Sequence, residues 1–433
     1  MKRLLLFTIG VTLLLSCSYD ETVDTNMLTV ELKFPTSSNE AEAMGGIRIE
    51  LKSISNNAIF VDSTDTQGKA HFEVTSGVYE ASTSVTRQHG NSLLVLNGTS
   101  GQIVIDKTKQ NTVFIDLMES RISQVVIKEL YNGGVMKDDG KLFMYDKCFI
   151  LYNNSNTTAS LENLCVGIAS PYNSQANNNW YGADGKLIYE SDGYTPATDG
   201  IWYFQETLHI APYSQIVVNV HGAINNAQTY PQSVNYANAD YYCMYDPEHG
   251  YTNTNYYPTP SEVIPTSHYL KAIKIGTSNA WALSTSSPAL YIFQTHDALP
   301  RDFATNVGNT GYTPGASQTD AFKVVKVPTE WITDGLEVFS ATSTGNKKRL
   351  TSMVDAGYVN LTNQHGHSLY RNVDKKATES LPENKGKLVY GYVSDPSGID
   401  AEASIRNGAH IVYQDTNNSS NDFHERLSCS LKD

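Results

Sequence analysis

An alternation of apolar and polar residues, with a period of two, constrains the fold of this chain more than any other feature. It runs through residues 27–118, where Leu28, Val30, Leu32 and Phe34 are separated by polar residues. Successive side chains of a β-strand point to opposite faces of a sheet, so the pattern indicates half-buried strands. An amphipathic helix would instead repeat every three to four residues.

A turn motif interrupts the alternation at residues 65–68 and supports the same interpretation. Its Asp and Gly are typical turn residues, and Gly68 accepts a positive φ angle at no steric cost. Strand patterns resume at Phe72 and again at residues 77–79. We therefore predict a small β-sandwich over residues 27–118.

Residues 121–433 form a second predicted β region, built from short apolar runs separated by Asn, Gly and Pro. Its strand candidates are residues 125–131, 146–152, 161–168, 208–220, 289–293, 322–327 and 368–371. Four longer stretches are expected to be loop insertions: 170–205, 222–270, 295–320 and 340–365. Loops of this length are uncommon in compact domains unless they carry function. The predicted fold class is all-β.

The composition excludes two broad classes of protein. A chain of 433 residues with 10% aromatic and 18% charged residues is too apolar to be disordered. Its net charge of −14 disfavours nucleic-acid binding, which depends on clustered Lys and Arg.

The first residues predict export from the cytoplasm. Lys2 and Arg3 precede an apolar run at residues 4–15, which is shorter than the roughly 20 residues of a membrane-spanning helix. This arrangement is typical of a signal peptide. Cys17 follows Ser16 and resembles the lipidated cysteine of bacterial lipoproteins.

We accordingly expect residues 1–17 to be a lipoprotein signal with its lipobox cysteine and residues 18–26 to be a tether. The lipid anchor at Cys17 would be the only membrane attachment, at the outer membrane. The acidic pair Asp20 and Glu21 resembles a surface-export signal, which predicts exposure at the cell surface. The simpler alternatives are a secretory signal with a chance Cys, followed by an ordinary polar tether.

The other four cysteines are Cys148, Cys165, Cys243 and Cys429. No CxxC spacing links them, so neither a zinc ribbon nor a thioredoxin-like motif is supported. Cys148 and Cys165 either pair across adjacent strands or are buried thiols. The sequence leaves this choice open.

Aromatic residues are densest between Tyr230 and Tyr269, where several prolines disfavour a long helix or a central strand. Tyr combines a flat apolar face with a polar tip, so such a loop can stack on a sugar, a planar cofactor or a peptide. Equally, a long loop needs aromatic side chains to attach it to the sandwich. The candidate ligand-binding residues are Trp180, Tyr181, Trp202, Tyr236, Tyr241, Tyr242, Tyr245, Tyr251, Tyr256 and Tyr257.

Evidence for a metal or a catalytic site is weaker. His365 and His367 share a face if they lie on a strand, and either His424 or His410 would complete a transition-metal or haem site. The alternative is an exposed polar loop. Nucleophile-elbow, HExxH, P-loop and dinucleotide motifs are absent from the sequence. We therefore predict a protein without a cofactor that is not an enzyme.

Two segments resemble known modules. Residues 64–69, with Phe72 and residues 77–79, resemble the prealbumin-like or carboxypeptidase-regulatory-like module, which implies a seven-stranded sandwich. Residues 125–131 with 146–155, closed by residues 415–423, resemble a lamin-tail-like domain, which is an immunoglobulin-type sandwich.

Together the modules make the chain similar to an uncharacterised family of Bacteroides lipoproteins, commonly found beside TonB-dependent transporters. This resemblance implies a surface-exposed, lipid-anchored accessory or ligand-binding protein of a TonB-dependent uptake system. Its partners would be the transporter and a small ligand, glycan or peptide, bound through the Tyr-rich loops. Two alternatives remain: a structural or adhesive surface lipoprotein, and a glycan or peptide hydrolase.

Overall fold

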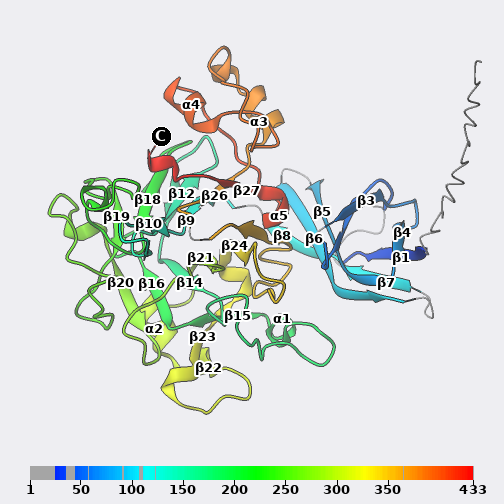
Figure 1. The fold of residues 1–433 in the computed structure, drawn as a ribbon, viewed down its shortest axis with the longest axis horizontal. Helices are drawn as coiled ribbons and strands as arrows, with labels where there is room; N and C mark the ends of the chain where they lie inside the picture. The colour runs from blue at the N-terminus through cyan, green and yellow to red at the C-terminus, as the bar shows by residue number, and fades with distance from the viewer. Residues whose placement is uncertain are drawn as a thin grey trace, which may run out of the picture.

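The computed structural model describes residues 25–35, 44–56, 58–89, 92–106, 111–121, 123–363 and 365–432 (Figure 1). Cys17 and the predicted signal lie outside the described residues. The α-helices within these ranges are short: α1 (Ile188–Asp192), α2 (Pro300–Thr305), α3 (Lys375–Ser380), α4 (Ala401–Arg406) and α5 (Ser419–Asp422). In this part of the chain no helix has the length and apolar character needed to cross a membrane. The all-β prediction is confirmed.

The N-terminal strands form two sheets that share one core. The first has the order β4-β1-β7 and the second β3-β2-β5-β6-β8. Their bounds are β1 (Thr25–Lys33), β2 (Arg48–Ser53), β3 (Ile59–Ser63), β4 (Lys69–Thr75), β5 (Gly77–His89), β6 (Ser92–Ile105), β7 (Asn111–Asp116) and β8 (Met118–Arg121). The alternating residues Leu28, Val30 and Leu32 are buried between the sheets, as the pattern predicts.

The predicted turn at residues 65–68 is also present. The Asp65 carboxylate accepts hydrogen bonds from the backbone N–H groups of Gln67 at 2.8 Å and Lys69 at 3.0 Å. Gly68 has a φ angle of 78°, a backbone conformation that residues with a Cβ atom rarely adopt. These bonds fix the entry into β4 and thereby the register between β4 and β1.

A twelve-stranded mixed sheet dominates the rest of the molecule, in the order β25-β24-β21-β14-β16-β20-β19-β18-β12-β9-β26-β27. Its strands are β9 (Val125–Tyr131), β12 (Cys148–Asn153), β14 (Leu164–Ile168), β16 (Gly200–Tyr203), β18 (Gln215–Asn219), β19 (Tyr242–Met244), β20 (Tyr269–Lys274), β21 (Ala289–Gln294), β24 (Ile332–Ser340), β25 (Val359–Leu361), β26 (Ser368–Arg371) and β27 (Phe423–Arg426). The residual strands are β10 (Val135–Met136), β11 (Leu142–Phe143), β13 (Ala159–Leu161), β15 (Tyr194–Thr198), β17 (Leu208–Ile210), β22 (Thr310–Tyr312) and β23 (Lys323–Pro328).

Three of the expected loop insertions contribute strands to this sheet. β16 and β19, which lie within the ranges 170–205 and 222–270, are interior strands of the sheet, and β25, within the range 340–365, is an edge strand. The sequence interpretation was wrong there, because strands of three or four residues are too short to show a period. Their places are set by tertiary pairing, such as the parallel pairs Cys243–Tyr269 and Met244–Leu270 between β19 and β20.

A buried ion pair connects β24 to the segment that follows it. On β24, the Glu337 carboxylate accepts hydrogen bonds from Arg349 Nε at 2.9 Å and Nη2 at 2.6 Å. It also accepts the backbone N–H groups of Arg349 and Leu350. Both charged side chains are fully buried, so each needs the other to offset its loss of hydration.

The small sandwich contacts the large body through polar side chains. Asn97 Nδ2 donates to the Thr416 carbonyl oxygen at 2.8 Å, and the Thr99 and Ser352 hydroxyls are 3.1 Å apart. The Lys52 ammonium lies 4.3 Å from the centre of the Tyr358 ring. Figure 1 accordingly shows α5 beside the ends of β6 and β8.

The four described cysteines are buried free thiols. Cys148 and Cys429 share a core cluster, whereas Cys165 and Cys243 each belong to another one. Of the two alternatives that the sequence leaves open for Cys148 and Cys165, the structure shows buried thiols rather than a pair. Cys148 lies on β12, and Cys165 lies on β14, five places away in the sheet order.

Removing one partner of the buried ion pair is expected to destabilise the protein strongly. Glu337→Ala leaves the Arg349 charge buried without compensation, so we expect a loss of about 3–5 kcal/mol in unfolding free energy. Urea denaturation at neutral pH measures this loss. Lys141→Ala is the control, because its side chain is 77% exposed, and it is expected to leave the midpoint unchanged. Equal midpoints for Glu337→Ala and wild type would contradict the account.

Candidate functional site

Half of the aromatic residues predicted to bind a ligand are buried in the core. Trp202 stacks on Tyr251 with ring centres 5.4 Å apart and packs against Tyr257 at 5.8 Å. The Tyr257 hydroxyl donates to the Trp281 carbonyl oxygen at 3.2 Å. Trp180 and Tyr236 are likewise buried. These five residues offer no free ring face, so the prediction that they bind a ligand is wrong.

Their role is to hold the long segments on the sheet, which is the alternative that the sequence left open. Tyr236 donates to the Asp146 carbonyl oxygen at 2.6 Å, and Trp180 Nε1 donates to the Ser170 hydroxyl at 3.2 Å. Segments with little regular structure make turns of their own but few strand pairs that would join them to the sheet. Large rings with one polar atom supply this attachment by combining apolar burial with a specific hydrogen bond.

The other five candidates are partly exposed and lie in several places. Tyr181 donates to the Lys348 carbonyl oxygen at 3.1 Å and belongs to a small cluster with Trp180. Tyr241 packs near Cys148, whereas Tyr245 packs near Cys243. Tyr256 covers the edge of His221. Tyr242 lines a surface groove.

This groove has a volume of about 90 Å³ and lies between the end of β16 and the 3₁₀ turn at Thr266–His268. Tyr242 and His268 stack with ring centres 4.1 Å apart and an interplanar angle of 15°. Phe204 packs against Tyr242 in a tilted arrangement, with ring centres 5.3 Å apart. The residues that line the groove include Phe204, Gln205, Glu206, Tyr242, His268 and Tyr269.

Polar groups at the groove are oriented by the backbone. Gln205 Nε2 donates to the carbonyl oxygens of Thr266 at 3.0 Å and Tyr269 at 2.6 Å, which fixes the amide plane. Burial, and to a lesser extent the nearby Glu206 carboxylate, raises the pKa of the Tyr242 phenol. The hydroxyl therefore stays protonated at neutral pH. A fixed amide, a carboxylate and an aromatic pair thus converge in one place.

Sequence reasoning named Tyr242 as a candidate but omitted the groove residues Gln205, Glu206 and His268 from the site. The adjacent Trp202-Tyr203-Phe204 run was the available indication, because it ends directly before Gln205. No pattern in the sequence shows that this run lies beside Tyr242. The pairing of β16 with β20, and of β20 with β19, produces that proximity.

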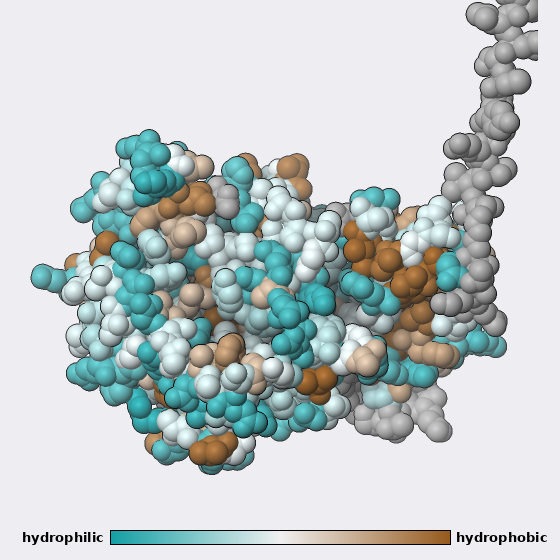
Figure 2. Space-filling model, turned by 60° about the horizontal axis from the view of Figure 1, so that its bottom comes forward, coloured by the Kyte–Doolittle hydropathy of each residue, from teal (hydrophilic) through white to brown (hydrophobic). Residues whose placement is uncertain are grey.

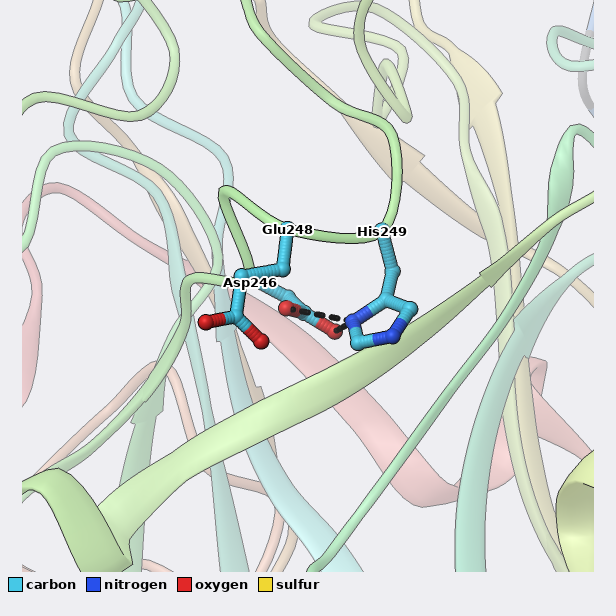
Figure 3. A group of neighbouring side chains, drawn as sticks. All are labelled: Asp246, Glu248 and His249. Atoms are coloured by element: carbon cyan, nitrogen blue, oxygen red, sulfur yellow. Dashed lines mark hydrogen bonds and ion pairs between the residues drawn. The ribbon is translucent and has the colours of Figure 1, made fainter.

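Asp246, Glu248 and His249 bring three ligand atoms within 4.8 Å of one another (Figure 3). The Asp246 carboxylate is buried, and both of its oxygens lie 3.0 Å from His249 Nδ1. It also accepts the Ala272 backbone N–H at 3.0 Å, and Lys271 Nζ is 3.7 Å away. Because the carboxylate is already compensated by these groups, its evident role is to join the end of β19 to β20.

The structure does not bring the histidines predicted to bind a metal together around one point. His367 Nδ1 lies 2.8 Å from Glu425, whereas His365 is exposed, with its ring centre 5.5 Å from that of His367. His424 Nδ1 contacts the Asn372 side-chain oxygen at 2.7 Å. His410 stacks on Tyr213 at 4.7 Å. Different partners therefore occupy each of these rings.

A buried polar cluster lies at the end of β12 and β18. Burial raises the pKa of Asp146 to about 6 and lowers that of Lys147 to about 7. Neither ring nitrogen of His221 has a hydrogen-bond partner among the described residues. Burial first, and the nearby Lys147 second, hold the pKa of His221 well below its ordinary value. His221 is thus neutral and packs between Tyr256 at 4.8 Å and Tyr257 at 5.6 Å.

The fold and this groove define an all-β protein in which a small sandwich precedes a large mixed sheet with a surface aromatic site. The chain belongs to a family of proteins of unknown function, DUF4876, whose model matches residues 211–430. The unmatched part supplies β9, β12, β14 and β16, which lie between strands of the matched part. The matched residues therefore depend on the preceding ones to complete the sheet.

A solved structure shows the same overall architecture. It is a DUF4876 family protein from Bacteroides thetaiotaomicron, 18% identical to this chain, with a TM-score of 0.52. The similarity covers 92% of this chain and 94% of that chain, so it includes the small sandwich as well as the large sheet. At this identity it shows a shared fold. No curated protein matches the sequence.

The neutral His221 predicts a pH-dependent stability that one substitution removes. A base whose pKa is lowered by folding stabilises the protein above its unfolded pKa of 6.5, and this stability is lost as the pH falls. Between about pH 7.5 and about pH 5.5 the loss is about 1.4 kcal/mol. His221→Phe, which keeps a ring between the tyrosines, should not show this loss.

Urea denaturation of both proteins at the two pH values tests this prediction. The exposed His209 supplies the control, because His209→Gln should retain the wild-type pH dependence. If the unfolding free energies of wild type and His221→Phe differ by the same amount at both pH values, the assignment of a neutral histidine is contradicted.

Proposed function

We propose that this protein is a lipid-anchored, surface-exposed ligand-binding protein of a TonB-dependent outer-membrane uptake system. The observation that carries the binding function is the groove with the stacked Tyr242 and His268. The anchor and the setting are supported by the sequence: the apolar leader that ends at Cys17, and the resemblance to lipoproteins beside TonB-dependent transporters.

The chemistry of the groove favours a glycan over an apolar ligand. Sugar rings bind through apolar contact with aromatic faces and through hydrogen bonds to fixed amides and carboxylates. Tyr242, Gln205 and Glu206 supply these groups. Sites for whole small molecules usually measure about 300–1,000 Å³. A groove of about 90 Å³ would therefore hold one sugar unit of a longer chain.

The small sandwich provides the spacer and a docking surface. β1 begins at Thr25, eight residues after Cys17, so the sandwich would be the part nearest to the membrane. Figure 2 shows hydrophobic residues gathered on the small sandwich, at the right of the view. On β3, Ile59, Phe60 and Val61 are exposed by 58%, 37% and 50%. In the described sheet β3 is an edge strand paired only with β2, an arrangement open to pairing with a partner protein.

Loss of the aromatic pair is expected to weaken glycan binding. The double substitution Tyr242→Ala with His268→Ala removes the stacking surface. Because stacking of a ligand ring on an aromatic side chain contributes about 1–3 kcal/mol, we expect at least about a tenfold loss of affinity. A glycan array followed by calorimetry measures the loss. Tyr312→Ala is the control, because Tyr312 is an exposed tyrosine on β22, outside the groove. Wild-type protein that binds no glycan would contradict the proposed ligand class.

Association with a transporter is tested separately. The tagged lipoprotein, extracted in mild detergent, should co-purify with an outer-membrane TonB-dependent transporter. Ile59→Lys with Val61→Lys should reduce the recovered transporter several-fold, because charges on an edge strand oppose strand pairing. Thr112→Lys, on the exposed outer side of β7, is the control. Purification of the wild-type protein without any transporter would contradict this part of the proposal.

A further inference from the structure

Cys148 and Cys429 are the two thiols that the fold places in the same buried cluster, although 280 residues separate them in the chain. The Cys148 side chain lies close enough to Cys429 to contribute to the raised pKa of that thiol. Both are fully buried in a cluster with Tyr131 and Tyr236. Cys165 and Cys243, which are also buried, belong to other clusters, so only one pair of described cysteines shares a cluster.

The backbone on both sides of this pair is fixed. Cys148 pairs with Tyr131 of β9 on one side and with Asn219 of β18 on the other. The Ser430 N–H donates to the buried Glu129 carboxylate at 3.0 Å, and the Ser368 hydroxyl donates to the Ser428 carbonyl oxygen at 3.0 Å. The residues on either side of Cys429 are therefore anchored to β9 and β26. Two side chains held in this way take the same relative position in every molecule.

From this geometry we propose that Cys148 and Cys429 form a structural disulfide bond in the exported protein. The bond would fasten the C-terminal segment to β12 in the centre of the large sheet. Disulfide bonds form in the oxidising compartments that exported proteins reach. The proposal depends on export, and it is independent of the groove and its ligand.

The reaction needs an oxidant, for which we name a thiol–disulfide oxidant of the cell envelope. Each cysteine thiol loses a proton and an electron, and the S–S bond forms between the two sulfur atoms. The oxidant's disulfide accepts the two electrons and two protons and becomes two thiols. Only the thiolate reacts, and burial raises the pKa of Cys429 well above its ordinary value. Oxidation therefore takes place during folding, before the C-terminal segment docks.

Differential alkylation of the full-length protein tests the bond. Protein isolated from the cell envelope is denatured in an alkylating reagent without reductant, and each cysteine is then mapped by peptide mass spectrometry. We expect Cys165 and Cys243 to be alkylated and Cys148 and Cys429 to be recovered as one cross-linked peptide pair. All four should be alkylated after reduction. Alkylation of Cys148 and Cys429 without reductant would overturn the proposal.

Substitutions separate this bond from an incidental cross-link. Cys429→Ser should render Cys148 alkylatable without reductant, whereas Cys165→Ser and Cys243→Ser should leave the Cys148–Cys429 pair protected. If Cys429→Ser folds poorly, Cys148→Ser provides the reciprocal result at Cys429. Reduction in denaturant followed by refolding without oxidant should lower the melting temperature of wild type and of Cys165→Ser by several degrees. An unchanged melting temperature for both would count against a structural role.

Discussion

The large sheet depends on pairing the charges that its core removes from water. Arg371 of β26 is buried, and its guanidinium contacts three carboxylates, those of Asp334, Asp415 and Asp422. An isolated charge at this depth would cost several kcal/mol, so the carboxylates and the guanidinium must be assembled together. The Asp334 carboxylate also accepts the Ile127 backbone N–H from β9 at 2.5 Å. One cation thus connects β9, β24, β26 and the segment before β27.

This constraint explains how the chain keeps its surface site in place. β19 and β16 are short, and they hold their positions only because longer neighbours pair with them on either side. The N-terminal part of the large body supplies some of those neighbours, and the C-terminal segment closes the far edge through β27. The buried aromatic residues act in a comparable way, because they attach to the sheet irregular segments that make few strand pairs with it. Tyr242 remains at the surface because β16 ends beside it.

The small sandwich could be predicted from the sequence because its signal is local. The alternation at Leu28, Val30 and Leu32 and the turn at Asp65 both appear in the structure as expected. β9 shows the opposite case. All seven of its residues are buried, including Lys128 and Glu129, which look solvent-exposed in the sequence. Their partners, Glu402 and Ser430, lie 274 and 301 residues away, a distance over which no local pattern operates.

The region of the candidate site could be predicted from the sequence, but the residues that form it could not. Aromatic density indicated the correct region, because Tyr242 and His268 both lie within it. It could not separate rings that face the core from rings that face solvent, since burial is decided by tertiary packing. Trp202 and Tyr251 have the same local sequence character as Tyr242 but stack against each other inside. Prediction of the groove would have needed the strand order, because that order places residues 204–208 beside residues 266–270.

The central claim is that the buried charges join the C-terminal segment and the central strands into one cooperative unit. Native-state hydrogen exchange measures this directly. The Asn372 and Thr416 N–H groups, which both donate to Asp422, should exchange with the same free energy and denaturant dependence as the Phe149 N–H of β12. Exchange of Asn372 and Thr416 through a local opening, insensitive to denaturant while Phe149 stays protected, would contradict the account.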